Sequence, residues 1–372
     1  MSAELRPIAA PHARPRPRGW RRWVAALVSP PVFDFWARNL SATLSWDRTL
    51  ARVVEHRSES RDAVTLVLRP NRHFGGYTPG QHLNVTAEID GVRVTRSYSP
   101  TSALREDGLL NLTVKHIPGG RMSSLLSQRI RVGDVLELSP AFGDLSLPAV
   151  LPEKLLLLAA GSGITPLMSL VRQLTGQGMP ADVTLLYWAR QRDELCFTSE
   201  LRAIAARMPR FRVRFLLTRE VPVKPDEAQG RIDSGVLMRK APDLSQRAVL
   251  ACGPSGFVAE ARRLAAPGAR SFHAEAFTPP APLHTDGHPV RVELRRSGRT
   301  LDLPTGTSLL AAMEAAGLQP VYGCRMGICQ TCACGKLAGV SQNLHTGDVQ
   351  TEPEQALRLC VSAARSDLVL DI

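Results

Sequence analysis

Residues 323–335 read Gly-Cys-Arg-Met-Gly-Ile-Cys-Gln-Thr-Cys-Ala-Cys-Gly, and a further cysteine follows at position 360. Four of these cysteines have the spacing Cys-x4-Cys-x2-Cys and then 27 residues to the fourth, a pattern in which thiolates wrap a loop around a 2Fe–2S cluster. Glycine at positions 323, 327 and 335 lets the backbone approach the sulfides closely. A zinc ion is the alternative, but structural zinc sites typically use two separate Cys-x-x-Cys pairs, and this stretch has one. The pattern therefore predicts a 2Fe–2S cluster with these ligands: Cys324, Cys329, Cys332 and Cys360.

The sequence on both sides of this stretch predicts a small α+β domain at 285–372. Two strands flank a turn at Ser297–Gly298, a helical pattern spans 308–316, and another strand candidate spans 368–370. Cys334 lies too close to Cys332 to replace it as a ligand without remodelling the loop, so we expect a packed thiol there. A proline-rich linker, with Pro279, Pro280 and Pro282, precedes the domain.

Residues 148–280 predict an α/β domain with a parallel sheet. Continuous apolar runs at 155–158, 183–186, 213–217 and 248–250 alternate with helical segments, as expected of strands that are covered on both faces. The turn Gly161–Ser162–Gly163 follows the first of these runs and precedes a helical pattern. Such a turn lets a pyrophosphate approach backbone N–H groups at the helix N-terminus, although an ordinary strand-to-helix turn looks the same in isolation.

Residues 46–147 predict an antiparallel β-barrel. Short alternating strands such as 63–68 and 110–115 are separated by turn signals such as Asp90–Gly91. The length of 372 residues is consistent with these three domains.

Charge is concentrated in an arm at residues 1–45. Lysine and arginine outnumber aspartate and glutamate by 46 to 34, and the arm alone has seven arginines against Glu4 and Asp34. An excess of basic residues can bind nucleic acid, an acidic protein or an anionic membrane. Because no nucleic-acid recognition fold accompanies the arm, we expect no nucleic-acid partner. The chain has no apolar run long enough for a membrane span or a signal peptide, and its seven cysteines do not suggest a disulfide framework. We therefore expect a cytoplasmic protein.

Three further motifs stand in order ahead of the cysteine stretch: Arg96–Ser97–Tyr98–Ser99, Gly119–Gly120–Arg121–Met122–Ser123–Ser124 and Cys252–Gly253–Pro254. With the Gly-x-Gly turn and the cysteine spacing, they make residues 46–372 resemble the ferredoxin–NADP reductase superfamily. The resemblance is to its three-domain members, which have a flavin-binding barrel, an NAD(P)-binding domain and a C-terminal plant-type ferredoxin of β-grasp fold.

The resemblance assigns the flavin ligands. It places Arg96 on the flavin pyrophosphate, Tyr98 against the ring or ribityl chain, and Ser99 at the flavin N5 edge. An arginine fork matches phosphate oxygens and an aromatic face stacks on a planar ring, which agrees with these roles. It also implies a phosphate site at the start of a helix near Met122, formed by Gly120, Ser123 and Ser124. The Gly-x-x-Ser form favours FAD over FMN.

In the same family, the nicotinamide ring lies near the glycine turn and the Cys-Gly motif. This makes Ser99, Thr165 and Cys252 the catalytic candidates, beside the cofactor-binding residues Gly161, Gly163 and Pro166. Cys252 as a small apolar filler is equally compatible with its position. Phe277 stands where two-domain reductases place an aromatic over the flavin, and a core phenylalanine is the alternative.

The choice between NADPH and NADH depends on the residues that follow the second strand of the α/β domain. A carboxylate there binds the ribose 2′-hydroxyl of NADH, whereas an arginine suits the 2′-phosphate of NADPH. Arg190 occupies the place, Asp193 comes three residues later, and Arg219 and Arg231 resemble further phosphate-binding positions. The pattern favours NADPH and leaves NADH open.

The order of the parts predicts an enzyme that converts hydride transfer into single-electron transfer. Nicotinamide donates two electrons together, a flavin accepts two and releases them singly, and a 2Fe–2S cluster carries one. The chain has no globin-like region, no Rieske pair and no di-iron ligand set, so we expect a separate acceptor.

The expected acceptor is a membrane-bound di-iron enzyme, with a fatty-acyl desaturase as the first candidate and an alkane-type hydroxylase as the second. The reason is that a chain with an apolar N-terminal segment before this order of domains resembles desaturase-associated reductases. The alternative acceptor is a soluble ring-hydroxylating oxygenase. The alternative function, from another class, is a redox-sensing binding protein.

Arginines beside Trp20 and Trp23 would suit a peripheral contact with an anionic membrane through residues 1–45. A basic tail followed by a segment packed on the barrel is the other interpretation of the arm. The sequence makes no prediction of the oligomeric state.

Overall fold

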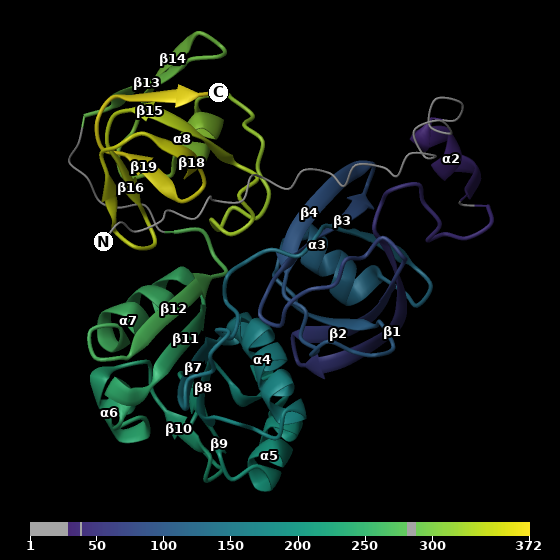
Figure 1. Ribbon diagram of the computed structural model, residues 1–372, viewed down its shortest axis with the longest axis vertical. Coiled ribbons are helices and arrows are strands. Elements are labelled where there is room, and N and C mark those ends of the chain that lie inside the picture. Colours follow the sequence, from purple (N-terminus) through teal and green to yellow (C-terminus); the bar gives the residue numbers. More distant parts are fainter. Residues whose placement is uncertain (1–28, 38, 281–287) are drawn as a thin grey trace, which may run out of the picture.

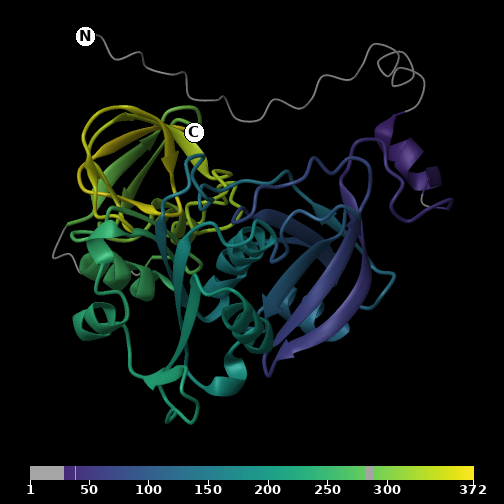
Figure 2. The ribbon, with the colours of Figure 1, turned by 60° about the horizontal axis from the view of Figure 1, so that its bottom comes forward.

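The computed structural model describes residues 29–37, 39–280 and 288–372, which form three domains and a short N-terminal helix (Figure 1). We call them the barrel domain, the parallel-sheet domain and the C-terminal domain. In Figures 1 and 2 the three domains meet near the centre of the molecule, and the N-terminal helix lies at the outer edge of the barrel domain. The predicted fold class is confirmed for all three domains.

The barrel domain is built on a six-stranded antiparallel sheet in the order β4-β3-β6-β1-β2-β5. An isolated bridge between Pro100 and Leu112 connects the segment after β4 to β5, so the two edges of the sheet meet. The side chains that face inward, such as Leu66, Leu83 and Leu112, are fully buried, which explains the alternating pattern of the sequence. The strands are β1 Leu50–Ser60, β2 Ala63–Pro70, β3 Leu83–Ile89, β4 Val92–Tyr98, β5 Leu110–Lys115 and β6 Val135–Leu138. A short helix, α3 (Arg121–Ser124), continues as a π-helical turn at Leu125–Arg129.

The parallel-sheet domain has six parallel strands in the order β10-β9-β8-β7-β11-β12. Leucines 155–158 of β7 are fully buried because helices cover both faces of the sheet. The strands are β7 Lys154–Ala160, β8 Asp182–Ala189, β9 Phe211–Leu217, β10 Glu227–Gln229, β11 Ala248–Gly253 and β12 Ser271–Ala276.

Two apolar cores lie on the two faces of this sheet. The helices α4 and α5 pack on one face, and α6 and α7 pack on the other. The strand order reverses between β7 and β11, and ligands of such sheets bind at the carboxyl ends of the strands at this point. The helices are α4 Ile164–Gly176, α5 Thr198–Arg207, α6 Ser234–Lys240 and α7 Ser255–Ala265, with 3-10 turns at Gly161–Gly163, Arg192–Glu194 and Leu244–Gln246.

The C-terminal domain contains a five-stranded sheet in the order β14-β13-β20-β15-β18, a three-stranded sheet in the order β17-β16-β19, and one helix, α8. Its first and last strands, β13 and β20, pair in parallel in the middle of the larger sheet. Cys334 is buried in the core between the sheet and α8, as a packed thiol should be. The elements are β13 Val290–Leu294, β14 Arg299–Leu303, α8 Leu309–Ala315, β15 Ala333–Ala338, β16 Ser341–Asn343, β17 Val349–Gln350, β18 Glu354–Arg358, β19 Ser362–Ala364 and β20 Leu368–Asp371.

The N-terminal helix, α2 (Pro30–Ala37), is attached to the segment that leads into the barrel. Asp34 accepts hydrogen bonds from the amide of Trp46 at 2.7 Å and from the hydroxyl of Ser45 at 3.0 Å, and Phe33 makes an edge contact with Trp46. Residues 1–28, which hold most of the predicted basic arm, lie outside the described residues. No helix in the described part of the chain is long and apolar enough to cross a membrane.

Polar contacts join the barrel domain to the parallel-sheet domain. Glu194 accepts from Arg61 at 3.1 Å and from Lys115 at 3.0 Å, and Ser169 Oγ accepts from the amide of Gly80 at 2.8 Å. All three domains border a cavity of about 210 Å³, whose lining includes Gly143 of the barrel domain, Glu275 of β12 and the loop Met326–Ile328. Glu275 and the loop Met326–Ile328, which lies between the first two cysteines of the cluster pattern, therefore line the same cavity.

Candidate flavin, nucleotide and cluster sites

Burial increases along the predicted flavin signature at the end of β4. Arg96 is exposed and donates to the carbonyl of its neighbour Thr95 at 2.7 Å. Tyr98 is half-buried, and burial raises the pKa of its hydroxyl, so it stays neutral. Ser99 is buried with 2% exposure. A charged fork at the surface, an aromatic face and a buried hydroxyl fit a flavin that runs from solvent into the interface between domains.

The second flavin motif forms a tight turn at the start of α3. Ser123 Oγ accepts from the amide of Ile117 at 3.2 Å and lies 3.2 Å from the carbonyl oxygen of Gly120. A Cβ atom on Gly120 would lie 2.5 Å from this hydroxyl and 3.0 Å from the carbonyl oxygen of Ile117, so a larger residue there would displace the Ser123 side chain. Ser124 Oγ instead lies 3.3 Å from His116 Nε2. The Ser123 hydroxyl is buried and holds the turn together. The Ser124 side chain is only half-buried.

The predicted nicotinamide residues meet at the strand-order reversal. A Cβ atom on Gly163 would lie 2.0 Å from the carbonyl oxygen of Cys252, so the glycine turn after β7 packs directly on the end of β11. Thr165 is buried and donates to the carbonyl of Ser162 at 2.9 Å, while Gly161 has φ +54° and Pro166 lies in the first turn of α4. Burial raises the pKa of Cys252, and the charge of Glu275 adds to this effect. Cys252 is therefore a neutral thiol.

The structure brings Ser99, Cys252 and Phe277 together and adds two residues that the sequence analysis missed. Ser99 Oγ lies 2.6 Å from His82 Nδ1, and His82 Nε2 contacts a carboxylate oxygen of Glu275. Phe277 lies at the edge of the His82 ring, with centroids 5.5 Å apart. Glu275 and Cys252 are register partners on β12 and β11. Glu275 could have been identified from the sequence, because it lies two residues before Phe277 and side chains two apart on a strand face the same side. No motif indicated His82.

Three arginines follow the carboxyl ends of adjacent strands. Arg190 comes after β8, Arg219 lies beside it after β9, with its amide 2.9 Å from the Arg190 carbonyl, and Arg231 comes after β10. All three are exposed, and their side chains make no hydrogen bond or ion pair within the described residues. They can therefore receive a phosphate.

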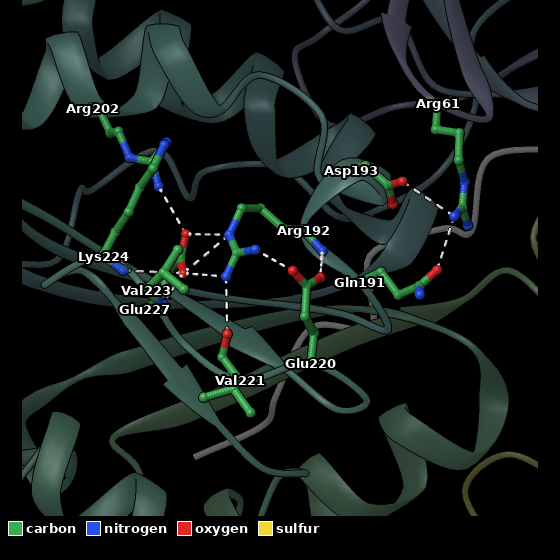
Figure 3. Close-up of polar contacts among 10 residues, drawn as sticks. All are labelled: Arg61, Gln191, Arg192, Asp193, Arg202, Glu220, Val221, Val223, Lys224 and Glu227. Atoms are coloured by element: carbon green, nitrogen blue, oxygen red, sulfur yellow. Dashed lines mark hydrogen bonds and ion pairs between the residues drawn. The ribbon is translucent and has the colours of Figure 1, made fainter.

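A fourth arginine in the same segment, Arg192, is occupied (Figure 3). Its guanidinium contacts Glu220 and binds Glu227 through Nη2 and Oε2 at 2.9 Å. The hydrogen bonds from Arg192 hold the pKa of Glu227 down to about 2. Asp193, the late carboxylate of the sequence, pairs with Arg61 of the barrel domain at 3.1 Å. These carboxylates are therefore already engaged with arginines.

The four predicted cluster ligands converge at the loop before β15. Amide groups point at their sulfur atoms: Cys324 Sγ accepts from the amides of Met326, Ile328 and Cys329 at 3.3–3.4 Å, and Cys360 Sγ accepts from Gly327 at 3.2 Å. The four side chains are close enough to share hydrogen bonds: the thiols of Cys329 and Cys360 donate to Cys324, which lowers the pKa of Cys324 and raises the pKa of both donors.

A Cβ atom on Gly323 would lie 2.7 Å from Cys329 Sγ, so this loop has no room for a side chain on its inner side. Thiolates surrounded by backbone donors fit a 2Fe–2S cluster. When bound, the flavin would accept the hydride of the nicotinamide and the cluster would take its electrons one at a time.

Comparisons with known proteins agree with this division of the chain. Three families match: the oxidoreductase FAD-binding domain at residues 50–146, the oxidoreductase NAD-binding domain at 157–263, and the 2Fe–2S iron-sulfur cluster binding domain at 292–365. These matches confirm FAD, NAD(P)H and a 2Fe–2S cluster as the cofactors.

Two relatives from Mycobacterium tuberculosis match nearly the whole chain. An NADPH oxidoreductase is 35% identical over 95% of this chain and 93% of its own length. A 3-ketosteroid-9-alpha-monooxygenase ferredoxin reductase component is 33% identical over 86% and 93%. The solved structure of phthalate dioxygenase reductase has the same fold, with a TM-score of 0.56 and 24% identity over 87% of this chain and 97% of that one. The chain therefore belongs to the ferredoxin–NADP reductase superfamily, as a three-domain NAD(P)H-dependent electron-transfer reductase with its own 2Fe–2S domain.

Proposed function

We propose that this protein oxidises NADPH, collects the hydride on FAD and delivers single electrons through its 2Fe–2S cluster to a separate oxygen-activating enzyme. The observation that carries the proposal is the cavity shared by the three domains. Glu275, from the group around Ser99, and the ligand loop Met326–Ile328 line the same cavity of about 210 Å³. We infer that electrons leave a flavin at Ser99 and reach the cluster beside this cavity, within one chain.

The preference for NADPH is supported by the free arginines at the strand ends. Arg190, Arg219 and Arg231 offer three cations to a 2′-phosphate, and no described carboxylate in the segment 190–194 lacks an arginine or lysine partner. Arginine binds phosphate through paired N–H groups, whereas the ribose hydroxyl of NADH needs a carboxylate.

The test is a stopped-flow comparison of NADPH and NADH with the purified holoprotein. We expect stoichiometric flavin and cluster, reduction of the flavin before the cluster, and a kcat/KM for NADPH at least tenfold above that for NADH with cytochrome c as acceptor. Reduction of the cluster without prior reduction of the flavin would contradict the electron path. A preference for NADH would contradict the nucleotide assignment alone.

We also propose that the acceptor is a membrane-bound di-iron enzyme, with a desaturase ahead of a hydroxylase. The specific support is an apolar surface on and after α2, formed by Val32, Phe35, Trp36 and Leu40, which are 51%, 65%, 65% and 84% exposed. Residues 1–28 add six arginines directly before it. Aromatic side chains favour the membrane interface and each arginine near an anionic surface contributes about 1 kcal/mol, so the two features act together. The name of the ketosteroid monooxygenase relative supports the alternative, the reductase component of a multicomponent oxygenase.

The membrane proposal is tested with vesicles that contain anionic lipid and with membranes that contain a desaturase. Deletion of residues 1–28 and the double variant Phe35→Ser/Trp36→Ser should each weaken vesicle binding at least tenfold and lower desaturation, with unchanged cytochrome c reduction. Val150→Ser is the matched control, because Val150 is 86% exposed but lies at the start of the parallel-sheet domain. Equal vesicle binding by all variants would contradict the membrane contact. If the protein reduced a soluble oxygenase but no desaturase, the acceptor would be the soluble oxygenase instead.

A further inference from the structure

A chain of three side chains connects the barrel domain to the parallel-sheet domain at the flavin site. Ser99 follows β4, His82 precedes β3, and Glu275 lies on β12. Ser99 Oγ is 2.6 Å from His82 Nδ1, and His82 Nε2 contacts Glu275 Oε2. Ser99 and His82 are almost completely buried, with 2% and 1% exposure. Water therefore does not compete for these hydrogen bonds.

The His82 ring is held in place from several sides. Its backbone pairs with Phe142 in both directions, with N···O distances of 2.7 and 3.0 Å. The rings of Phe142 and Phe277 have centroids 6.0 and 5.5 Å from that of His82. A Cβ atom on Gly143 would lie 2.8 Å from His82 Cδ2, so the glycine leaves room for the imidazole. The ring cannot easily turn over and exchange its two nitrogens.

For a neutral His82 beside an ionised Glu275, the donors and acceptors in this chain have only one consistent order. An ionised carboxylate can only accept, so the nitrogen of a neutral His82 that faces Glu275 must carry the hydrogen. The other nitrogen, Nδ1, is then an acceptor, and Ser99 must donate its hydroxyl hydrogen to it. The second carboxylate oxygen of Glu275 accepts from the amide of Asp144 at 3.2 Å, which fixes the orientation of the carboxylate.

We propose that His82 is a positioning residue that directs the Ser99 hydroxyl hydrogen away from flavin N5, so that Ser99 offers N5 only an acceptor. This inference rests on the proposed position of Ser99 at the N5 edge. Oxidised flavin has a bare N5, which would need a donor, whereas reduced flavin carries hydrogen there and needs an acceptor. The chain from Glu275 through His82 to Ser99 therefore favours the reduced flavin and raises its midpoint potential.

Two substitutions reverse this effect and one preserves it. In His82→Phe, the Ser99 hydroxyl loses its acceptor and is free to donate to N5. In Glu275→Gln, the amide of Asp144 retains the side-chain oxygen, so the new NH2 group faces His82 and moves the imidazole hydrogen to Nδ1, which again turns the Ser99 hydrogen toward N5. In His82→Gln, the side-chain oxygen can accept from Ser99 while the NH2 group donates to Glu275.

The experiment measures the flavin midpoint potential in these three holoproteins and in the control His273→Gln, an exposed histidine on β12. We expect His82→Phe and Glu275→Gln to favour oxidised flavin at least tenfold, a shift of about 30 mV for a two-electron couple. His82→Gln and the control should keep the potential of the native protein. An unchanged potential in Glu275→Gln, or a potential in His82→Gln as low as in His82→Phe, would overturn the proposal.

A second measurement uses the flavin-free protein. The ¹⁵N signals of His82 should show hydrogen on Nε2 in the native protein and on Nδ1 in Glu275→Gln. The same tautomer in both proteins would overturn the proposal, even if His82→Phe did not fold. In either case NADPH oxidation and cluster reduction by the native protein remain as the separate test of the proposed function.

Discussion

Arg192 and Glu227 form an ion pair in which the carboxylate side chain is completely buried and the guanidinium is 26% exposed, with Nη2 and Oε2 2.9 Å apart (Figure 3). Arg190, two residues earlier, is exposed, and its side chain makes no hydrogen bond or ion pair within the described residues. The two arginines are alike in sequence and opposite in environment, so they have different predicted roles.

Replacement of Arg192 should destabilise the parallel-sheet domain. Arg192→Met leaves Glu227 with Arg202 at 3.5 Å and the backbone amides of Val223 and Lys224 as partners. We expect the free energy of unfolding to fall by about 2 kcal/mol, as for a buried charge that loses its principal partner. Denaturant unfolding measures this loss, and Arg190→Met is the matched control that should unfold like the native protein. Equal stability of the two variants would contradict the structural role of Arg192.

Replacement of Arg190 should change cofactor choice. In Arg190→Asp, a carboxylate faces the 2′-phosphate, so kcat/KM for NADPH should fall at least tenfold while NADH is used as well or better. The loss corresponds to one charged hydrogen bond of about 1.5–3 kcal/mol. Steady-state kinetics with NADPH and NADH measures the change. Unchanged selectivity would show that Arg190 does not bind the 2′-phosphate.

Gly163→Ala should damage the nucleotide site without touching the flavin. The added methyl would lie 2.0 Å from the carbonyl oxygen of Cys252, so the turn after β7 must move away from the end of β11. We expect a loss of about 1–3 kcal/mol in unfolding free energy and much weaker NADPH binding. Calorimetric titration with NADP⁺ measures the binding, and Gly176→Ala, at the end of α4 with open space around it, is the control. Native affinity in Gly163→Ala would show that the turn tolerates the displacement.

Cys329→Ser should separate the two electron-transfer steps. The variant should lack the 2Fe–2S absorbance yet keep NADPH-to-ferricyanide activity within about twofold, because the cluster ligands and the flavin residues belong to different domains. Cys334→Ser, outside the ligand set, should retain the cluster. Loss of ferricyanide activity in a folded, flavin-loaded Cys329→Ser protein would contradict independent domains.

Acid should weaken the parallel-sheet domain over a defined range. The pKa of Glu227 is lowered from about 4.5 to about 2, first by the hydrogen bond from Arg192. A lowered pKa stabilises the folded state above the unfolded value, and this stabilisation is lost as the pH falls from about 4.5 toward 2. Thermal unfolding at pH 3 and pH 6 should therefore differ less in Arg192→Met than in the native protein. If the difference in thermal stability between pH 3 and pH 6 were the same in the variant and the native protein, other carboxylates would be responsible for the acid sensitivity.

The sequence predicts the three domains because their patterns are local. The alternation at 63–68, the continuous run at 155–158 and the cysteine spacing each depend on near neighbours in the chain, and the structure has β2, β7 and the ligand loop at these places. His82 and Glu275 could not be paired this way, because 193 residues separate them and only the docking of two domains brings them together. Arg190 and Arg192 could not be distinguished, since their difference lies in the distant partners Glu220 and Glu227.

The parallel pairing of β13 with β20 also sets the order in which the protein can acquire its cofactors. β20 lies between β13 and β15 in the larger sheet of the C-terminal domain, yet it is the last of that domain's strands to leave the ribosome. The sheet cannot close, and Cys360 cannot join the other three ligands, until almost the whole domain has been translated. The barrel domain is complete some 200 residues earlier on the sequence. During synthesis, flavin loading can therefore precede iron–sulfur assembly.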